Sequence, residues 1–253
     1  NLPSIGYLAG DKPEGLALLE DGSLAVLNDN DFSLTGDLDT ATGEVGVVEP
    51  TSPTVLGFIS FDDSNGLDAS DSDNAINIQN WPIYGMYMPD AIASFEVNGE
   101  TFYITANEGD ARDEDARVAD LELDPDAFPN AAELQADENL GRLEVSTIDG
   151  DIDGDGDHDQ LFAYGSRSFT IWDQFGNLVF DSGDALEKIV AEYVPEYFNS
   201  DNDESTFDTR SDAKGPEPEG VTIGVIDGTP YAFIGLERVG GAVTYDVSDP
   251  ANP

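Results

Sequence analysis

Hydrophobic and polar positions alternate most regularly at the end of the sequence, in residues 215–253. Apolar runs at 221–225, 231–236 and 242–247 are separated by an Asp-Gly pair and a Gly-Gly pair. A period of two with short glycine turns between the runs is typical of strands joined as hairpins. We therefore predict a three-stranded antiparallel meander in this part of the chain.

A short signature opens this meander and occurs twice more in the chain. It consists of a proline, an acidic residue and a small residue, at positions 13–15, 89–91 and 218–220. Each copy is followed by an apolar strand, a turn, a second strand and a loop rich in carboxylates. Repetition of a sheet module favours a β-propeller, in which blades surround a central channel. The predicted fold is therefore all-β, a β-propeller with long acidic loops and, at 129–140 and 184–193, one or two short helices.

About four blades can be counted, which is fewer than most closed propellers contain. Residues 1–253 are therefore expected to form a single β-propeller domain or the C-terminal part of a larger propeller. Residues 1–8 resemble an outer strand that would complete a blade. The approximate blade boundaries are 13–61, 88–160, 161–183 and 216–250.

The acidic residue of each signature would occupy an equivalent position near one mouth of the channel. These residues are Glu14, Asp90 and Glu219. Three carboxylates at like positions repel one another unless a cation or a base lies between them. The alternative is that each carboxylate caps a turn or pairs with an arginine, and the sequence leaves both interpretations open.

The charge of the chain restricts its partners. There are 54 acidic residues against 9 lysines and arginines, a formal net charge of −45. Such a surface repels nucleic acid and anionic lipid and suits divalent cations as partners. Disorder is common in strongly acidic chains, but a hydrophobic content of 39% in alternating strands argues against it here.

Rare residue types exclude several kinds of site. The chain has no cysteine, so it has neither a disulfide nor a thiolate metal site. Its single histidine, His158, excludes a centre built on several histidines. No apolar run is long enough to span a membrane. We infer an extracellular location, secreted or on the cell surface, from the acidity and from the motifs described next.

The most specific motif is the acidic stretch DGDIDGDGDHD at 149–159. From Asp151 onward it places oxygens at positions 1, 3, 5 and 9 and a glycine at position 6, which is a calcium-loop pattern. Phe162 stands where a bidentate glutamate would be expected, so the loop is a variant between strands. The predicted cofactor is calcium, and the predicted ligands are Asp151, Asp153, Asp155, Asp157 and Asp159.

Two further acidic segments, 62–73 and 199–212, lack a fixed ligand spacing. Either could hold a cation, but a solvated loop is the better interpretation of each.

Bases are informative in a chain that otherwise avoids them. Arg112, Arg167, Arg210, Lys214 and Arg238 all lie close to predicted strand ends. Arginine suits a bidentate grip on phosphate or carboxylate. We predict that Arg112, Arg210, Lys214 and Arg238 hold an anionic substrate such as a phosphate ester. Internal salt bridges to nearby acids are an equally weighted alternative.

Several long segments resemble one known family. They include NWPIYGMYMPDAIASFEVNGETFYITANEGDARDE and DGDIDGDGDHDQLFAYGSRSFTIWD, and the likeness covers residues 65–253. These segments resemble the choice-of-anchor I family, which includes mesenchyme-specific cell-surface glycoproteins and bacterial proteins labelled alkaline phosphatase. Residues 12–31 resemble the propeller family named for the esterase-like activity of phytase. The resemblance implies a secreted or surface-anchored propeller that handles calcium and phosphate, but it supplies no catalytic residues. Members of the family usually carry further propeller sequence upstream, so the resemblance also implies that this chain associates with such an upstream portion.

Two functions follow from these observations. The first is a calcium-dependent phosphoesterase, in which a cation-polarised water attacks the phosphate, because no Ser-His-Asp triad is legible. The second is a non-catalytic matrix or adhesion module that associates with other surface proteins. The placement of the bases distinguishes them: a phosphoesterase requires convergence in one pocket, whereas a matrix module predicts bases paired with local acids around the rim.

Overall fold

The computed structural model describes residues 65–202 and 206–253 in full, and five backbone strands between residues 13 and 60. Most regular structure in these parts is strand, so the predicted all-β class is confirmed, although the sheets do not close into a ring. The outer strand expected at 1–8 lies outside the described residues. No helix in the described part of the chain has the length and apolar character needed to cross a bilayer.

The closing meander forms as predicted. Its three strands pair antiparallel in chain order, with Val221 opposite Ile234 and Ile223 opposite Ala232. Asp227 and Gly228 form the first turn with positive φ values of 52° and 87°, as a two-residue hairpin turn of this handedness requires. The strands are β14 (Pro218–Ile226), β15 (Thr229–Leu236) and β16 (Ala242–Asp246).

A four-stranded antiparallel sheet groups the strands differently from the predicted blades. Segments expected in separate blades, 88–160 and 161–183, share this sheet, because β8 pairs with β12 from Phe102 opposite Asp173 to Asn107 opposite Ser168. Residues 108–167 leave the sheet and return to it, so this excursion does not mark a blade boundary. In spatial order the strands are β13 (Leu178–Asp181), β12 (Ser168–Asp173), β8 (Glu100–Asn107) and β7 (Ala91–Val97).

A third sheet of short strands is built largely from the excursion. Its one parallel pair joins β6 to β11, and the other neighbours are antiparallel. The strand expected at 142–147 is present as β10. In spatial order the strands are β5 (Phe58–Ser60), β6 (Tyr84–Met86), β11 (Phe162–Ala163), β10 (Glu144–Ser146) and β9 (Asp115–Arg117).

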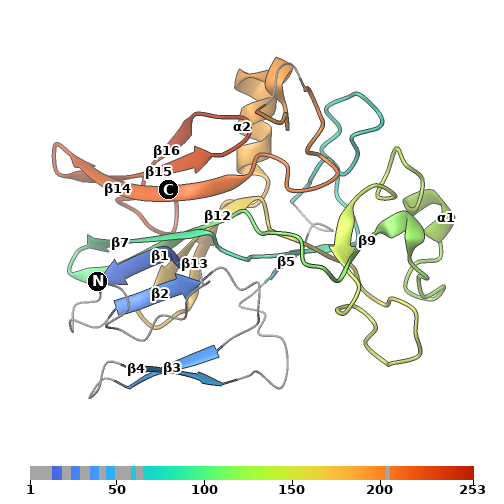
Figure 1. Cartoon of the computed structure of the whole chain (residues 1–253). Coiled ribbons are helices and arrows are strands. Elements are labelled where there is room, and N and C mark those ends of the chain that lie inside the picture. Colours follow the sequence, from blue (N-terminus) through green and yellow to red (C-terminus); the bar gives the residue numbers. More distant parts are fainter. Residues whose placement is uncertain are drawn as a thin grey trace.

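Two N-terminal hairpins complete the strands, and the first repeats a detail of the closing meander. In β1 the pairing register shifts between Pro13 and Gly15, and in β14 it shifts between Pro218 and Gly220. Both copies of the signature therefore place their glutamate at a β-bulge. Strand β7 lies between β1 and β14, so the first strands of the three repeats are neighbours (Figure 1). The hairpins are β1 (Pro13–Leu18) with β2 (Leu24–Asn28), and β3 (Thr35–Asp39) with β4 (Glu44–Val48).

Two hydrophobic cores hold the described part together. One joins the four-stranded sheet, the closing meander and α2 through buried residues such as Phe169, Ile234 and Leu186. The other lies under the short-strand sheet, around Leu143 and Trp81. Both predicted helices are present, the first shorter than expected, and Figure 1 shows α2 beside the closing meander. The helices are α1 (Ala131–Leu134) and α2 (Ala185–Tyr193), with 3-10 turns at Val118–Asp120 and Pro195–Tyr197.

Candidate functional site

The acidic loop predicted to bind calcium connects β10 to β11 and folds back on itself. The Asp151 carboxylate accepts hydrogen bonds from the N–H groups of Gly154 at 2.7 Å and Gly156 at 3.2 Å. Both glycines have positive φ, 80° and 105°, which a residue without a side chain adopts readily. Asp159 closes the loop, because its Oδ2 accepts a hydrogen bond from the Ile152 N–H at 2.8 Å.

Carboxylate oxygens of the loop form two groups with the spacing of a cation site. One oxygen from each of Asp151, Asp153 and Asp159 lies within 4.8 Å of the other two. A second group, formed by Asp124, Asp157 and Asp159, meets the same limit. Carboxylate oxygens gathered in this way are the hard ligands that calcium prefers.

The membership of these groups differs in two places from the predicted ligand set. Asp124 was not predicted, because a lone aspartate in another loop carries no spacing signal. It is brought to the acidic loop by a backbone bridge between Leu123 and His158, and its N–H donates to the His158 carbonyl at 3.0 Å. Asp155 belongs to neither group, and its Oδ1 accepts a hydrogen bond from the Asp157 N–H at 3.3 Å.

Electrostatics within the loop favour a bound cation. Desolvation and the charges of Asp155 and Asp124 raise the pKa of Asp157 to about 6. The charge of Asp155 also raises the pKa of Asp153. Asp157 Oδ1 is buried and has no hydrogen-bond partner among the residues that the structure describes. A divalent ion would relieve this repulsion, so the residues present fit calcium.

The three carboxylates expected at a channel mouth lie on or beside neighbouring strands. Glu14 is in β1, and its side chain is outside the described part of the chain. Asp90 is half-buried immediately before β7, with its N–H donating to the Ala106 carbonyl at 2.9 Å, and Glu219 is exposed in β14. Neither Asp90 nor Glu219 joins a metal-sized group of acids within the described ranges. A cation shared by the three side chains therefore stays a prediction.

Three of the four bases predicted to hold an anion meet at one buried carboxylate, that of Glu217. Arg210 Nε lies 2.5 Å from its Oε1. Arg238 Nε and Lys214 Nζ lie 3.3 Å and 3.9 Å from its Oε2. Glu217 is fully buried, and three cations surround it.

Further acids neutralise the same bases. Lys214 Nζ lies 2.5 Å from Glu108 Oε1, and Arg238 Nε lies 3.1 Å from Glu237 Oε2. Burial lowers the pKa of Lys214, but the hydrogen bond and charge of Glu108 outweigh it, so the net shift is upward and Lys214 stays cationic. Arg112 lies apart, where its charge acts on the Tyr164 hydroxyl. The bases thus converge, as a substrate pocket requires, but they are paired with local acids, as the alternative predicts.

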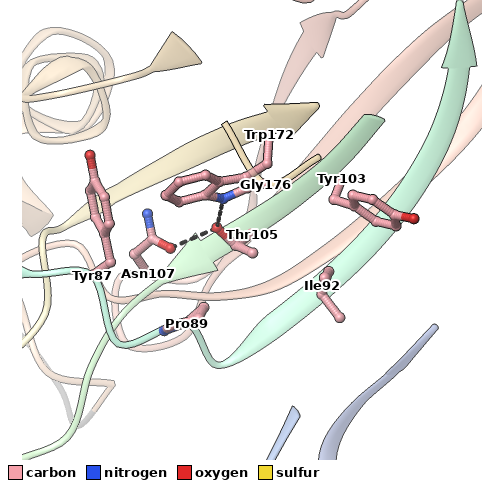
Figure 2. A pocket seen from close by; sticks show the side chains of 8 residues that line it. All are labelled: Tyr87, Pro89, Ile92, Tyr103, Thr105, Asn107, Trp172 and Gly176. Carbon is pink, nitrogen blue, oxygen red and sulfur yellow. Dashed lines mark hydrogen bonds between the residues drawn. The ribbon is translucent and has the colours of Figure 1, made fainter. Parts of the chain in front are cut away.

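A cavity of about 300 Å³ opens on the four-stranded sheet beside β7, β8 and β12. Its lining is mainly aromatic and apolar (Figure 2). Its polar groups bond to one another: Trp172 Nε1 and Asn107 Oδ1 lie 3.2 Å and 2.9 Å from Thr105 Oγ1. The lining contains neither a carboxylate nor a lysine or arginine, so this cavity lacks the groups that phosphate hydrolysis uses. It is lined by Tyr87, Pro89, Ile92, Tyr103, Thr105, Asn107, Trp172 and Gly176.

Comparison with known proteins identifies the class. Residues 34–250 match the family model of the choice-of-anchor I domain, and the chain belongs to that family. The predicted resemblance to this family is therefore confirmed, whereas the likeness of residues 12–31 to the family named for the esterase-like activity of phytase stays a prediction.

Two curated relatives make the likeness more specific. The chain is similar to gigasin-3a of Magallana gigas, with 37% identity over 118 residues, covering 44% of this chain and 41% of the relative. It is also similar to the mesenchyme-specific cell surface glycoprotein of Strongylocentrotus purpuratus, with 25% identity over 226 residues, covering 74% of this chain and 29% of the relative. The chain thus spans less than half the length of either relative. No solved structure matches it.

Proposed function

We propose that this chain is a non-catalytic calcium-binding module of an extracellular or cell-surface protein. The family and the cell-surface glycoprotein among the relatives suggest the location. The observation that carries the calcium proposal is the gathering of Asp151, Asp153 and Asp159 oxygens within 4.8 Å in a loop closed by its own backbone.

The bound ion would have a structural role. Asp151, Asp153 and Asp159 would hold it, and Asp124 and Asp157 form an adjoining group that shares Asp159. Calcium at this position would neutralise the crowded carboxylates and hold the acidic loop closed, and an ion at the adjoining group would fasten the loop to the segment that carries Asp124. Part of the folding stability would then depend on calcium, as it does whenever an ion binds the folded chain alone.

The ion pairs favour the matrix or adhesion alternative over the phosphoesterase. Arg210, Lys214 and Arg238 already satisfy buried or neighbouring carboxylates, so an incoming phosphate would have to displace those acids. The described cavity supplies no acid or base for hydrolysis. An acidic surface that binds divalent ions suits a protein that assembles with other surface molecules through calcium.

The repeated strands support a propeller-like arrangement, which we include in the proposal. The bulges at Glu14 and Glu219 are equivalent, and β7 lies between the strands that carry them. In a propeller the first strand of each blade faces the channel. We infer that β1, β7 and β14 are such inner strands and that closure requires more sheet than the described residues contain.

Calcium titration of chelator-treated protein by isothermal calorimetry tests the proposal. The double variant Asp151→Asn/Asp153→Asn should lose one bound calcium per chain relative to the parent. Asp227→Asn is the control for loss of a charge outside the loop, because it removes one carboxylate from an exposed turn, whereas the double variant removes two. Unchanged stoichiometry in the double variant would contradict the loop site. Hydrolysis of phosphate monoesters is expected at background with and without calcium, and a calcium-dependent rate that the double variant loses would favour the phosphoesterase.

A further inference from the structure

The cavity on the four-stranded sheet has no part in the calcium proposal. It lies on the face opposite the core shared with the closing meander, because Tyr103 and Thr105 alternate along β8 with the core residue Ile104. Trp172 pairs with Tyr103 across the strands, and Ile92 pairs with Thr105, so both share this face. A cavity of about 300 Å³ is large enough for a small organic ligand.

Three aromatic side chains contribute most of the cavity wall. The rings of Tyr87 and Trp172 are perpendicular, with an interplanar angle of 87° and centroids 5.6 Å apart. Tyr103 lies further along the sheet, with its hydroxyl directed away from these two rings (Figure 2). The faces of such rings carry partial negative charge. Several of them around one small cavity are the arrangement with which proteins bind quaternary ammonium ions.

The polar groups of the lining bond to one another and leave little for a ligand. Asn107 Nδ2 donates to Ser168 Oγ at 3.2 Å and to Thr170 Oγ1 at 3.3 Å. Asn107 Oδ1 and Trp172 Nε1 both bond to Thr105 Oγ1, which also lies 2.5 Å from Thr170 Oγ1. A sugar requires several free hydrogen-bonding groups, whereas a quaternary ammonium ion requires none. The lining therefore favours the ammonium ion.

The charge nearest to the cavity wall is a carboxylate without a base. Asp181 faces the Tyr87 hydroxyl, and burial together with this charge raises the pKa of Tyr87. Asp181 Oδ1 accepts from the Gly183 N–H at 2.7 Å, whereas the buried Oδ2 has no hydrogen-bond partner in the described ranges. Burial raises the pKa of Asp181, and no base is among the groups that act on it. A carboxylate in this position is stabilised by a cation nearby.

The composition of the lining excludes other classes of charged ligand. It contains no lysine or arginine, so a phosphate or carboxylate ligand would be held without a counter-charge. It also contains no carboxylate, so a calcium or magnesium ion would lack its oxygen ligands there. The net charge of −45 attracts cations to the protein as a whole. An organic cation that is weakly hydrated satisfies all of these conditions.

We propose that this cavity binds a quaternary ammonium group, such as the trimethylammonium group of choline, against the rings of Tyr87, Tyr103 and Trp172. The site is separate from the acidic loop at 149–159 and does not depend on the calcium proposal. Free choline should bind more tightly than phosphocholine, because the phosphate adds an anion that no base in the lining can balance.

Isothermal calorimetry at saturating calcium and at about 0.15 M ionic strength measures the binding of choline. The ligand control is dimethylbutanol, the neutral isostere of choline in which carbon replaces the nitrogen. The variants are Trp172→Leu and Tyr103→Leu. Their matched control is Tyr193→Leu, which removes a tyrosine that is 72% exposed at the end of α2, outside the lining. All three variants keep the net charge, so binding to the acidic surface in general would not change.

We expect one choline per chain, and binding of dimethylbutanol that is weaker by at least about tenfold. Trp172→Leu should weaken choline binding by at least about tenfold and Tyr103→Leu by at least about threefold, whereas Tyr193→Leu should leave it unchanged. Near-ultraviolet circular dichroism establishes that each variant is folded, and Tyr103→Leu, at a half-buried position, decides the test if Trp172→Leu does not fold.

Four results would overturn the proposal. The first is the absence of choline binding, and the second is binding of dimethylbutanol as tight as that of choline, which would show a merely apolar cavity. The third is choline binding that the folded cavity variants leave unchanged, which would place the ion on the acidic surface. The fourth is binding of a neutral sugar such as glucose more tightly than choline.

Discussion

Removal of the Glu217 carboxylate should destabilise the protein strongly, because this one group serves three bases. In Glu217→Gln, Lys214 keeps Glu108, and Arg238 keeps Glu237 at 3.1 Å. Arg210 loses its partner at 2.5 Å and is only 25% exposed. Breaking a buried ion pair by removing one partner costs about 3–5 kcal/mol. Because water reaches part of Arg210, we expect the lower end, about 3 kcal/mol, or a fall in Tm of about 6–12 °C.

Urea unfolding at fixed ionic strength and saturating calcium measures this effect. Glu237→Gln is the matched control, since it removes the same charge from a side chain that is 35% exposed and leaves Arg238 paired with Glu217. The control should lose less than about 1 kcal/mol. If Glu217→Gln lies within about 1 kcal/mol of the control, the network does not hold this region together. A gain of phosphate affinity in Glu217→Gln would indicate that the bases are poised for an anion.

Three further outcomes are expected. Gly165→Ala should destabilise the fold by several kcal/mol, since the new Cβ would lie 1.6 Å from the Glu108 carbonyl oxygen. Gly176→Ala, at a similar φ but with open space around it, should cost about 1 kcal/mol. Urea unfolding compares the two variants. Burial holds the pKa of Asp208 at about 7 against an ordinary 3.8. Protonation of Asp208 therefore stabilises the folded chain fully below about pH 4, and this stabilisation is lost as pH rises through about 7. In chelator, Tm should fall less between pH 5 and 8 in Asp208→Asn than in the wild type. Calcium at 100 times its dissociation constant should raise the free energy of unfolding by about 2.7 kcal/mol, and a Tm that does not respond to chelator would contradict the proposed loop site.

Local patterns predicted the elements well, because alternation and turn chemistry act over a few residues. The closing meander, the helix at 184–193 and the bulged Pro-Glu-Gly signature all have local causes. Strand partners were not predictable in the same way. The period of two shows that β8 and β12 are strands, but nothing in it reveals that they pair across a long excursion.

The same difference applies to the candidate sites: contacts between residues close in sequence could be predicted, and contacts between distant segments could not. The acidic loop at 149–159 was recognised from spacing, since its ligands lie close in sequence, whereas Asp124 is added by a backbone bridge between distant segments. The sequence left two roles open for Arg210, substrate binding and an internal salt bridge. The fold decides between them, because it places the buried carboxylate of Glu217 2.5 Å from Arg210 Nε. Asp208 was read as solvated because only tertiary packing shows that it is enclosed.

The excursion from the four-stranded sheet has a consequence for biosynthesis. When β8 leaves the ribosome, its partner β12 is still 60 residues away in the chain, since Asn107 precedes Ser168 by residues 108–167. At ordinary translation rates this delay lasts about 3–12 seconds. During that interval the edge of β8 is open to pairing with other nascent chains. A chaperone that covers this edge would protect the chain most effectively at this stage of its synthesis.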